Sequence, residues 1–171
     1  EKQQRWNDFS LFGPPSKKYT ISTNQLKLMV KPLPDRKNGK VSAVVGSWNI
    51  RSGISSTSVR QDEAVTFQII INGTGNIQTV DISNIYFPNE LEVFEQPQIQ
   101  IKENPLRDHI GGEKKFEWVL IPRFAGDIYI PQIQFNYFDP TQAKWLTQST
   151  TRHRLQVSPN EKAPISSIGL S

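Results

Sequence analysis

Hydrophobic and polar residues alternate along most of this chain in short runs, and no segment shows the period of an amphipathic helix. The runs are rich in Ile, Val, Phe, Thr and Tyr, and they are separated by Gly, Pro, Asn and Asp. Many short strands at close spacing are typical of a β-sandwich or a β-barrel. The pattern therefore predicts an all-β fold.

Two segments show the strand pattern most strongly. Residues 64–71 (AVTFQIII) are almost entirely apolar, as expected for a strand in the interior of a sheet. In residues 116–121, Phe116, Trp118 and Leu120 share one face, because successive side chains of a strand point to opposite sides. Further strands are predicted at residues 41–50 with a break at Gly46, at 77–85, around Leu91 and Val93, and at 144–147 and 153–157.

Polar segments separate these strands. Residues 51–63 are rich in serine and predict a loop, and residues 72–76 (NGTGN) predict a turn with two glycines able to take positive φ. Residues 95–115 predict a long loop with one edge strand at Ile99 and Ile101.

The apolar pattern changes parity within residues 127–138. Ile128 and Ile130 share one parity, but Phe135 and Tyr137 take the other. A bulge at residues 131–132 would explain the change, because an inserted residue moves the following side chains to the opposite face. Residues 138–141 (FDPT) then predict a type I turn.

Proline residues mark a boundary near the beginning of the chain. Residues 20–30 predict a half-buried strand, in which Leu26, Leu28 and Val30 alternate with polar or flexible side chains. The prolines that follow, in KPLP, remove backbone donors and stiffen the chain. We therefore expect residues 1–34 to be the end of a preceding domain with its linker, 35–158 one domain, and 159–171 a polar tail.

Composition narrows the possible classes of protein. The chain has 171 residues, no cysteine and a net charge of +4, so disulfides and thiolate metal sites are excluded. The basic residues are scattered in small surface groups such as Lys114-Lys115, which argues against nucleic-acid binding. The chain has no long apolar run and does not begin with Met. We expect it to be a processed piece whose membrane anchor lies outside the chain.

Candidate catalytic chemistry is sparse. The two histidines, His109 and His153, lack a second metal ligand at suitable spacing and are expected to be solvated. No serine lies in a G-x-S-x-G turn. Residues 73–75 (GTG) lack the third glycine and the helix of a phosphate loop. The sequence therefore predicts no catalytic residue, no cofactor site and no metal site.

Aromatic residues are the best candidates for an interaction surface. Trp118 lies in a strongly apolar strand and is expected in the core, whereas Trp48 and Trp145 lie on weaker strands and are candidates for partial exposure. Exposed rings can bind partner proteins or sugars, and the alternative is that they cover an end of the sandwich. The predicted interaction surface consists of Trp48 and Trp145, joined by Trp6, Phe9 and Phe12 before the linker.

Several motifs resemble the BatD family, the aerotolerance-associated (oxygen tolerance) proteins of Bacteroidetes and other Gram-negative bacteria. In chain order they are KPLP (31–34), AVVGSWNI (43–50), AVTFQIIINGTGNI (64–77), FEWVLIPRFAGDIYIPQIQFNYFDP (116–140) and HRLQV (153–157). The resemblance implies tandem immunoglobulin-like β-sandwich domains, behind a signal peptide and before a transmembrane helix. It also implies that the strand at residues 20–30 closes a preceding sandwich.

The resemblance implies a function without assigned catalytic residues. Members are encoded beside MoxR-type AAA+ ATPases and membrane proteins with von Willebrand A domains, which are the expected partners. We therefore expect a non-catalytic interaction or spacer module in the periplasm, held at the inner membrane by an anchor outside this chain. The alternative is a carbohydrate-binding or adhesin-like sandwich using Trp48 or Trp145. An enzyme is the third reading, and it would need a pocket with convergent polar groups.

Overall fold

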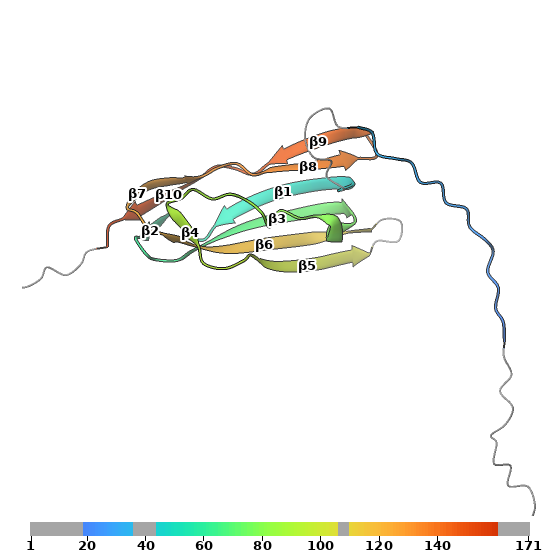
Figure 1. Cartoon of the computed structure of the whole chain (residues 1–171), viewed down its shortest axis with the longest axis horizontal. Helices are drawn as coiled ribbons and strands as arrows, with labels where there is room; N and C mark the ends of the chain where they lie inside the picture. Colours follow the sequence, from blue (N-terminus) through green and yellow to red (C-terminus); the bar gives the residue numbers. More distant parts are fainter. Residues whose placement is uncertain (1–18, 36–43, 106–109, 161–171) are drawn as a thin grey trace, which may run out of the picture. The chain divides into compact units, whose positions relative to one another are not determined.

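The computed structural model of this chain describes residues 19–35, 44–105 and 110–160. The chain divides into two units, Glu1–Pro32 and Leu33–Ser171, and each is described by itself. In the described residues the second unit consists of β-strands and one short 3-10 helix, η1 (Figure 1). In chain order the elements are β1 (Gly46–Ile54), β2 (Ser58–Arg60), β3 (Val65–Gly75), η1 (Ile77–Thr79), β4 (Leu91–Val93), β5 (Gln98–Pro105), β6 (Ile110–Pro122), β7 (Gly126–Ile130), β8 (Gln134–Asp139), β9 (Lys144–Ser149) and β10 (His153–Ser158).

The strands form antiparallel sheets that pack around one core. The larger sheet has the order β1-β3-β6, and both β4 and β5 pair with the far side of β6. The other strands form a three-stranded sheet, β2-β10-β7, and a β8-β9 hairpin. Within these sheets all pairs are antiparallel except β2 with β10. The predicted all-β fold is confirmed, and it is an immunoglobulin-like β-sandwich.

Alternation along the central strands builds the core. On β6, Phe116, Trp118 and Leu120 are buried, and their neighbours in the sequence are half-buried. The same pattern on β3 buries Phe67 and Ile69 completely. Phe67 and Trp118 lie directly opposite each other in the register, with ring centroids 6.0 Å apart. The strands predicted at residues 64–71 and 116–121 are therefore confirmed, and residues 116–121 have the predicted inward face.

The strand predicted at residues 20–30 is not formed. Residues 19–35 have no regular secondary structure, and Leu26, Leu28 and Val30 are 88%, 86% and 89% exposed. A strand is stabilised by a ladder of hydrogen bonds to a neighbour, and no described residue pairs with this segment. The alternating pattern alone therefore did not produce a strand here.

Two predictions about residues 72–85 are wrong. Residues 72–75 are not a turn but the last part of β3, because β1 pairs with them on one side and β6 reaches Thr74 on the other. Residues 77–85 are not a strand. Asn76 accepts a hydrogen bond from the Gln78 backbone N–H at 3.1 Å and begins η1, after which residues 80–88 run without regular structure.

The two long loops are shorter than predicted. In the first, β1 extends to Ile54 and β2 begins at Ser58. In the second, the edge strand at Ile99 and Ile101 is confirmed as β5, and β6 begins as early as Ile110. The strand predicted at residues 41–50 begins in the structure at Gly46, and residues 41–43 lie outside the described residues.

The change of parity in residues 127–138 has a different cause from the predicted bulge. The chain leaves β7 after Ile130, passes through residues 131–133 without regular structure and enters β8 at Gln134. β7 pairs with β10, whereas β8 pairs with β9. Because β7 and β8 belong to different strand pairs, residues of one parity can face the core in β7 and residues of the other parity in β8. The turn predicted at residues 138–141 is displaced, because Phe138 and Asp139 still pair with β9 and the turn lies at residues 140–143. There the Asp139 carboxylate accepts from the Thr141 backbone N–H at 2.8 Å.

Candidate interaction surface

The described part of the larger sheet has one open edge, along β5. β5 pairs with β6 over its whole length, and no described segment pairs with its other side. Ile99 and Ile101 lie opposite Phe116 and Lys114, on the inner side of the sheet, yet they are 45% and 38% exposed. An edge strand with unpaired backbone groups and apolar side chains is a template for pairing with another chain.

Apolar exposure continues from β5 onto β4. Both strands pair with the same side of β6, one after the other. Val93 on β4 is 42% exposed, and Phe94, whose backbone N–H donates to the Val119 carbonyl at 3.0 Å, is 60% exposed. We call Val93, Phe94, Ile99 and Ile101 together the β4–β5 edge.

The opposite edge of the same sheet is closed by a side chain. The Gln148 amide on β9 accepts from the Ile50 backbone N–H at 3.1 Å and donates to the Trp48 carbonyl at 2.7 Å. It thus imitates the peptide group of a neighbouring strand. Just before β1, the Val44 carbonyl accepts from the Phe138 N–H at 3.0 Å. β1 is therefore not available for strand pairing along these residues.

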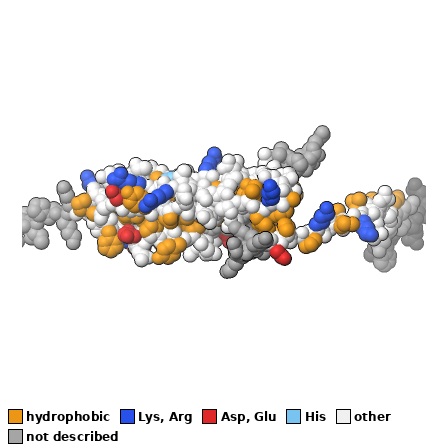
Figure 2. Space-filling model, turned by 90° about the horizontal axis from the view of Figure 1, so that it is seen from above, with side chains coloured by type: hydrophobic (Ala, Val, Ile, Leu, Met, Phe, Trp, Pro, Cys, Tyr) orange, Lys and Arg blue, Asp and Glu red, His pale blue; other side chains and the backbone are white. Residues whose placement is uncertain are grey.

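Basic side chains do not form one concentrated patch on the face that Figure 2 shows. Its Lys and Arg side chains are spread among polar and hydrophobic atoms rather than gathered in one patch (Figure 2). This agrees with the scattering of basic residues along the sequence.

The predicted aromatic surface is corrected at Trp48. Trp48 is 2% exposed and belongs to the core, so it cannot serve as an exposed binding residue. Trp145 on β9 is half-buried; its ring centroid lies 5.4 Å from that of Phe138, and its Nε1–H donates to the Pro34 carbonyl at 3.0 Å. Trp118 is in the core, as predicted. Trp6, Phe9 and Phe12 lie outside the described residues.

Glycines at the ends of β1 and β3 explain how Trp48 is buried. A Cβ atom on Gly46, Gly73 or Gly75 would come within 2.9 Å of the Trp48 indole. The three residues therefore form a slot that the ring fills, which we call the glycine slot. The GTG motif (residues 73–75), expected to form a turn, contributes two of its walls. No sequence pattern indicated this slot, because Gly46 and Gly75 lie opposite each other only after β1 and β3 pair.

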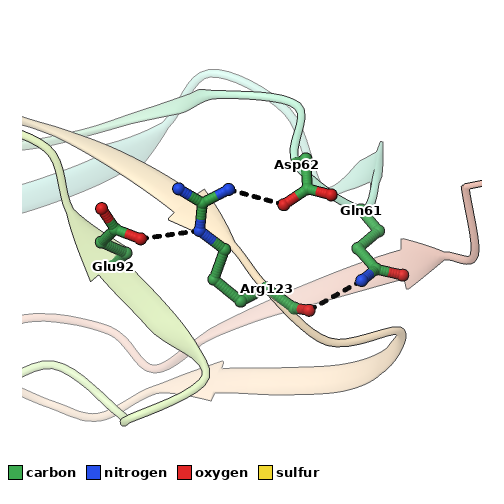
Figure 3. A network of polar contacts seen from close by, with 4 residues as sticks. All are labelled: Gln61, Asp62, Glu92 and Arg123. Carbon is green, nitrogen blue, oxygen red and sulfur yellow. Dashed lines mark hydrogen bonds and ion pairs between the residues drawn. The ribbon is translucent and has the colours of Figure 1, made fainter.

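An arginine network fixes one end of the sandwich (Figure 3). Arg123 donates through Nε to Glu92 at 2.7 Å and through Nη1 to Asp62 at 2.6 Å, and its carbonyl accepts from Gln61 Nε2 at 2.8 Å. The hydrogen bonds to Glu92 and Asp62 raise the pKa of Arg123 above its ordinary value. All three charged side chains are well exposed, so the network orients the loops more than it stabilises the fold.

A serine–histidine pair connects the two layers. Ser52 Oγ on β1 lies 2.7 Å from His153 Nε2 on β10, and Thr151 Oγ1 lies 3.2 Å from the same nitrogen. The imidazole is half-buried and meets the Phe67 ring edge-on, with centroids 5.6 Å apart. The prediction of a solvated His153 is therefore wrong. Residues 52 and 153 are 101 positions apart, and only the packing of the sheets could bring them together.

This pair is better suited to joining the layers than to catalysis. A nucleophilic serine needs a base that is oriented by a third group, usually a carboxylate on the other ring nitrogen. Here the imidazole bonds to two hydroxyls through one nitrogen. Among the described residues no group of three His, Asp or Glu side chains could hold a metal ion.

The half-buried histidine predicts a pH-dependent stability. Burial lowers the pKa of His153 below its ordinary value of 6.5, so the folded chain favours the neutral imidazole. Below pH 6.5 the unfolded chain binds this proton more readily than the folded chain, and the free energy of unfolding falls as the pH drops. Urea denaturation at pH 7.5 and pH 5.0 should show this loss.

Matched variants assign that loss to His153. His153→Gln cannot titrate, so its loss between the two pH values should be much smaller than that of the unchanged chain. His109→Gln removes the other histidine and should retain the full loss. Equal losses in all three proteins would show that burial of His153 does not cause the effect.

A hollow of about 580 Å³ lies at the ends of β3, β5 and β6. The register places Asn72, Glu113 and Lys102 side by side in its lining. These groups can form hydrogen bonds with a ligand. No helix in the described ranges is long and apolar enough to cross a membrane.

Comparison with known proteins identifies a family for most of the sandwich. The family model described as "BatD DUF11 like domain" matches residues 52–157. This match confirms the resemblance drawn from the sequence motifs, three of which lie wholly inside it. No curated protein and no solved structure matches the chain.

Proposed function

Because the chain belongs to the BatD family, we propose that it is a non-catalytic interaction and spacer module of a membrane-anchored BatD-like protein in the periplasm. Its partners are the von Willebrand A-domain membrane proteins that the resemblance implies, acting with a MoxR-type ATPase. The observation that carries this proposal is the β4–β5 edge, where β5 has no described neighbour on its outer side and four apolar side chains are exposed.

The architecture suits a spacer as well as a binding surface. β3 and β6 pair over ten residues each, so the sandwich resists bending along them. The prolines at positions 32 and 34 restrict the backbone before the domain. A stiff module of this kind presents its open edge in a fixed orientation relative to the rest of the sandwich.

The carbohydrate-binding alternative has weaker support. It relied on exposed tryptophan rings, and Trp48 is buried in the glycine slot. Trp145 is half-buried against Phe138. Sugar binding on a sandwich face depends on rings that are open to the ligand. We therefore favour protein recognition.

Binding to purified von Willebrand A domains of the neighbouring membrane proteins tests the proposal. Ile99→Lys places a charge on the β4–β5 edge and should weaken binding at least about tenfold, or about 1.4 kcal/mol. Phe124→Lys changes an apolar residue in the β6–β7 turn that is more exposed than Ile99, and it should leave binding unchanged. Isothermal titration calorimetry gives both values. If the unchanged chain binds none of these domains, the proposed function is wrong.

A further inference from the structure

β5 has a side-chain pattern that is complementary to itself. Its inner face carries Ile99 and Ile101, and its outer face carries Gln98, Gln100 and Lys102. When two copies of such a strand run antiparallel about a two-fold axis at Gln100, Ile99 lies opposite Ile101 of the second copy. Both isoleucine pairs then fall on the same, inner face, and Gln98 lies opposite Lys102 of the second copy, without a like-charge contact.

Other registers are less favourable. A shift of the pairing by one residue would place isoleucines opposite polar side chains of the other face. An axis at Ile101 would set Ile99 against the Glu103 carboxylate, and an axis at Ile99 would set Ile101 opposite Pro97, outside the strand. The Gln100 register alone among these brings both isoleucines of each copy into apolar contact.

We infer that β5 pairs antiparallel with β5 of a second copy of this chain, about a two-fold axis at Gln100, and joins two larger sheets into one. This inference goes beyond the proposed function, because it names a second occupant of the same edge and can hold without the first. Three further observations support the second copy. The β1 edge of the same sheet is closed by Gln148. Lys102 lies opposite the acidic Glu113 in the β5–β6 register, so its nearest cross-strand neighbour on β6 has the opposite charge. Ile99 and Ile101 gain an apolar cover that the single chain does not give them.

The contact is small, and a weak, reversible dimer is expected. Strand pairing over residues 98–102 covers far less than the roughly 1,000 Å² typical of stable complexes. A covalent trap is therefore more sensitive than a measurement of mass in solution. The chain has no cysteine, so each introduced thiol can pair only with its counterpart in a second copy.

A single cysteine at position 100 tests the register directly. In the inferred pair, residue 100 lies opposite itself, with Cα atoms about 4.5–5.5 Å apart, within the range for a disulfide. Gln98→Cys is the matched control on the same strand and face; its two thiols would be roughly 13 Å apart, at about 3.4 Å per residue. Mild oxidation followed by non-reducing electrophoresis should give at least about tenfold more dimer for Gln100→Cys than for Gln98→Cys.

The possible results separate this inference from the proposed function. Equal trapping of both variants, or more trapping of Gln98→Cys, would overturn the β5–β5 pair. If in that case Ile99→Lys still weakens binding to von Willebrand A domains, the edge serves a different partner and the proposed function stands. Selective trapping of Gln100→Cys without any binding to those domains would support the dimer and reject the proposed partners. Circular dichroism of each reduced variant establishes that it is folded.

Discussion

Gly46→Ala is expected to destabilise the sandwich by about 2 to 6 kcal/mol, from about 1–3 kcal/mol of backbone strain and about 1–3 kcal/mol of over-packing. Gly46 has a φ of +149°, a conformation that L side chains rarely adopt. An added Cβ would lie 2.0 Å from the Thr74 carbonyl oxygen and 2.7 Å from Trp48 Nε1. The carbonyl belongs to the paired strand β3 and cannot move aside without breaking the β1–β3 ladder.

The size of this effect follows from how little stability a domain of this kind has. Typical domains unfold with a free energy of about 5–15 kcal/mol, so the upper part of the range would leave much of the protein unfolded at 25 °C. Urea denaturation followed by far-UV circular dichroism measures the loss. Tryptophan fluorescence should shift to longer wavelength if the indole of Trp48 leaves the glycine slot.

Gly126→Ala is the matched control for Gly46→Ala. Gly126 also has a positive φ, +130°, but nothing lies within 4 Å of an added Cβ. This variant should therefore lose only the strain, about 1–3 kcal/mol. If both variants lost the same stability, the close contact with Thr74 and Trp48 would play no part in the cost.

The central strands could be predicted because their burial is encoded locally. Phe116, Trp118 and Leu120 stand at every second position of a strand, and that spacing alone places them on one face. The same holds for residues 64–71 of β3. The family resemblance added the sandwich topology, which no single strand specifies.

The failures share a different cause, which is pairing between distant segments. Residues 72–75 have the composition of a turn, but β1 and β6 hold them in a ladder, and tertiary pairing overrides turn propensity. Residues 20–30 have the composition of a strand, but no described neighbour pairs with them. An alternating pattern predicts which side of a strand would be buried. It does not predict whether a neighbouring strand is present to pair with it.

The candidate surface could be predicted only in part. The edge strand at Ile99 and Ile101 was expected from alternation, but its importance depends on the closure of the other edge by Gln148. A polar glutamine in β9 carries no sequence signal for such a role. The burial of Trp48 was missed for a similar reason. It requires Gly46 on β1 and, 27 and 29 positions later, Gly73 and Gly75 on β3, which become its neighbours only after the strands pair.

Lys114 is the second residue whose replacement should have a large effect. The sequence placed it in a solvated pair with Lys115, but it is 7% exposed on the inner face of β6. Its Nζ donates to the Val80 carbonyl at 2.5 Å and lies 5.4 Å from the centroid of the Phe116 ring. Residues 80–88 have no strand ladder of their own, so this bond helps hold them against the core.

Lys114→Ala should cost about 2 to 4 kcal/mol, because it removes a charge-assisted hydrogen bond and the packed aliphatic stem. Hydrogen exchange should accelerate most in residues 80–88, since these depend on Lys114 directly. Lys114→Met retains most of the stem and should recover part of the stability without restoring slow exchange there. Urea denaturation and exchange mass spectrometry measure the two effects.

Lys115→Ala is the control, one residue further along β6 and on the opposite face. Lys115 forms a surface ion pair with Glu117, and such pairs contribute about 0–1 kcal/mol. This variant should therefore remain close to the unchanged protein in both measurements. If Lys114→Ala and Lys115→Ala behaved alike, residues 80–88 would be held by Val80, Phe87 and their other apolar contacts alone. The buried ammonium of Lys114 would then contribute no net stability to the fold.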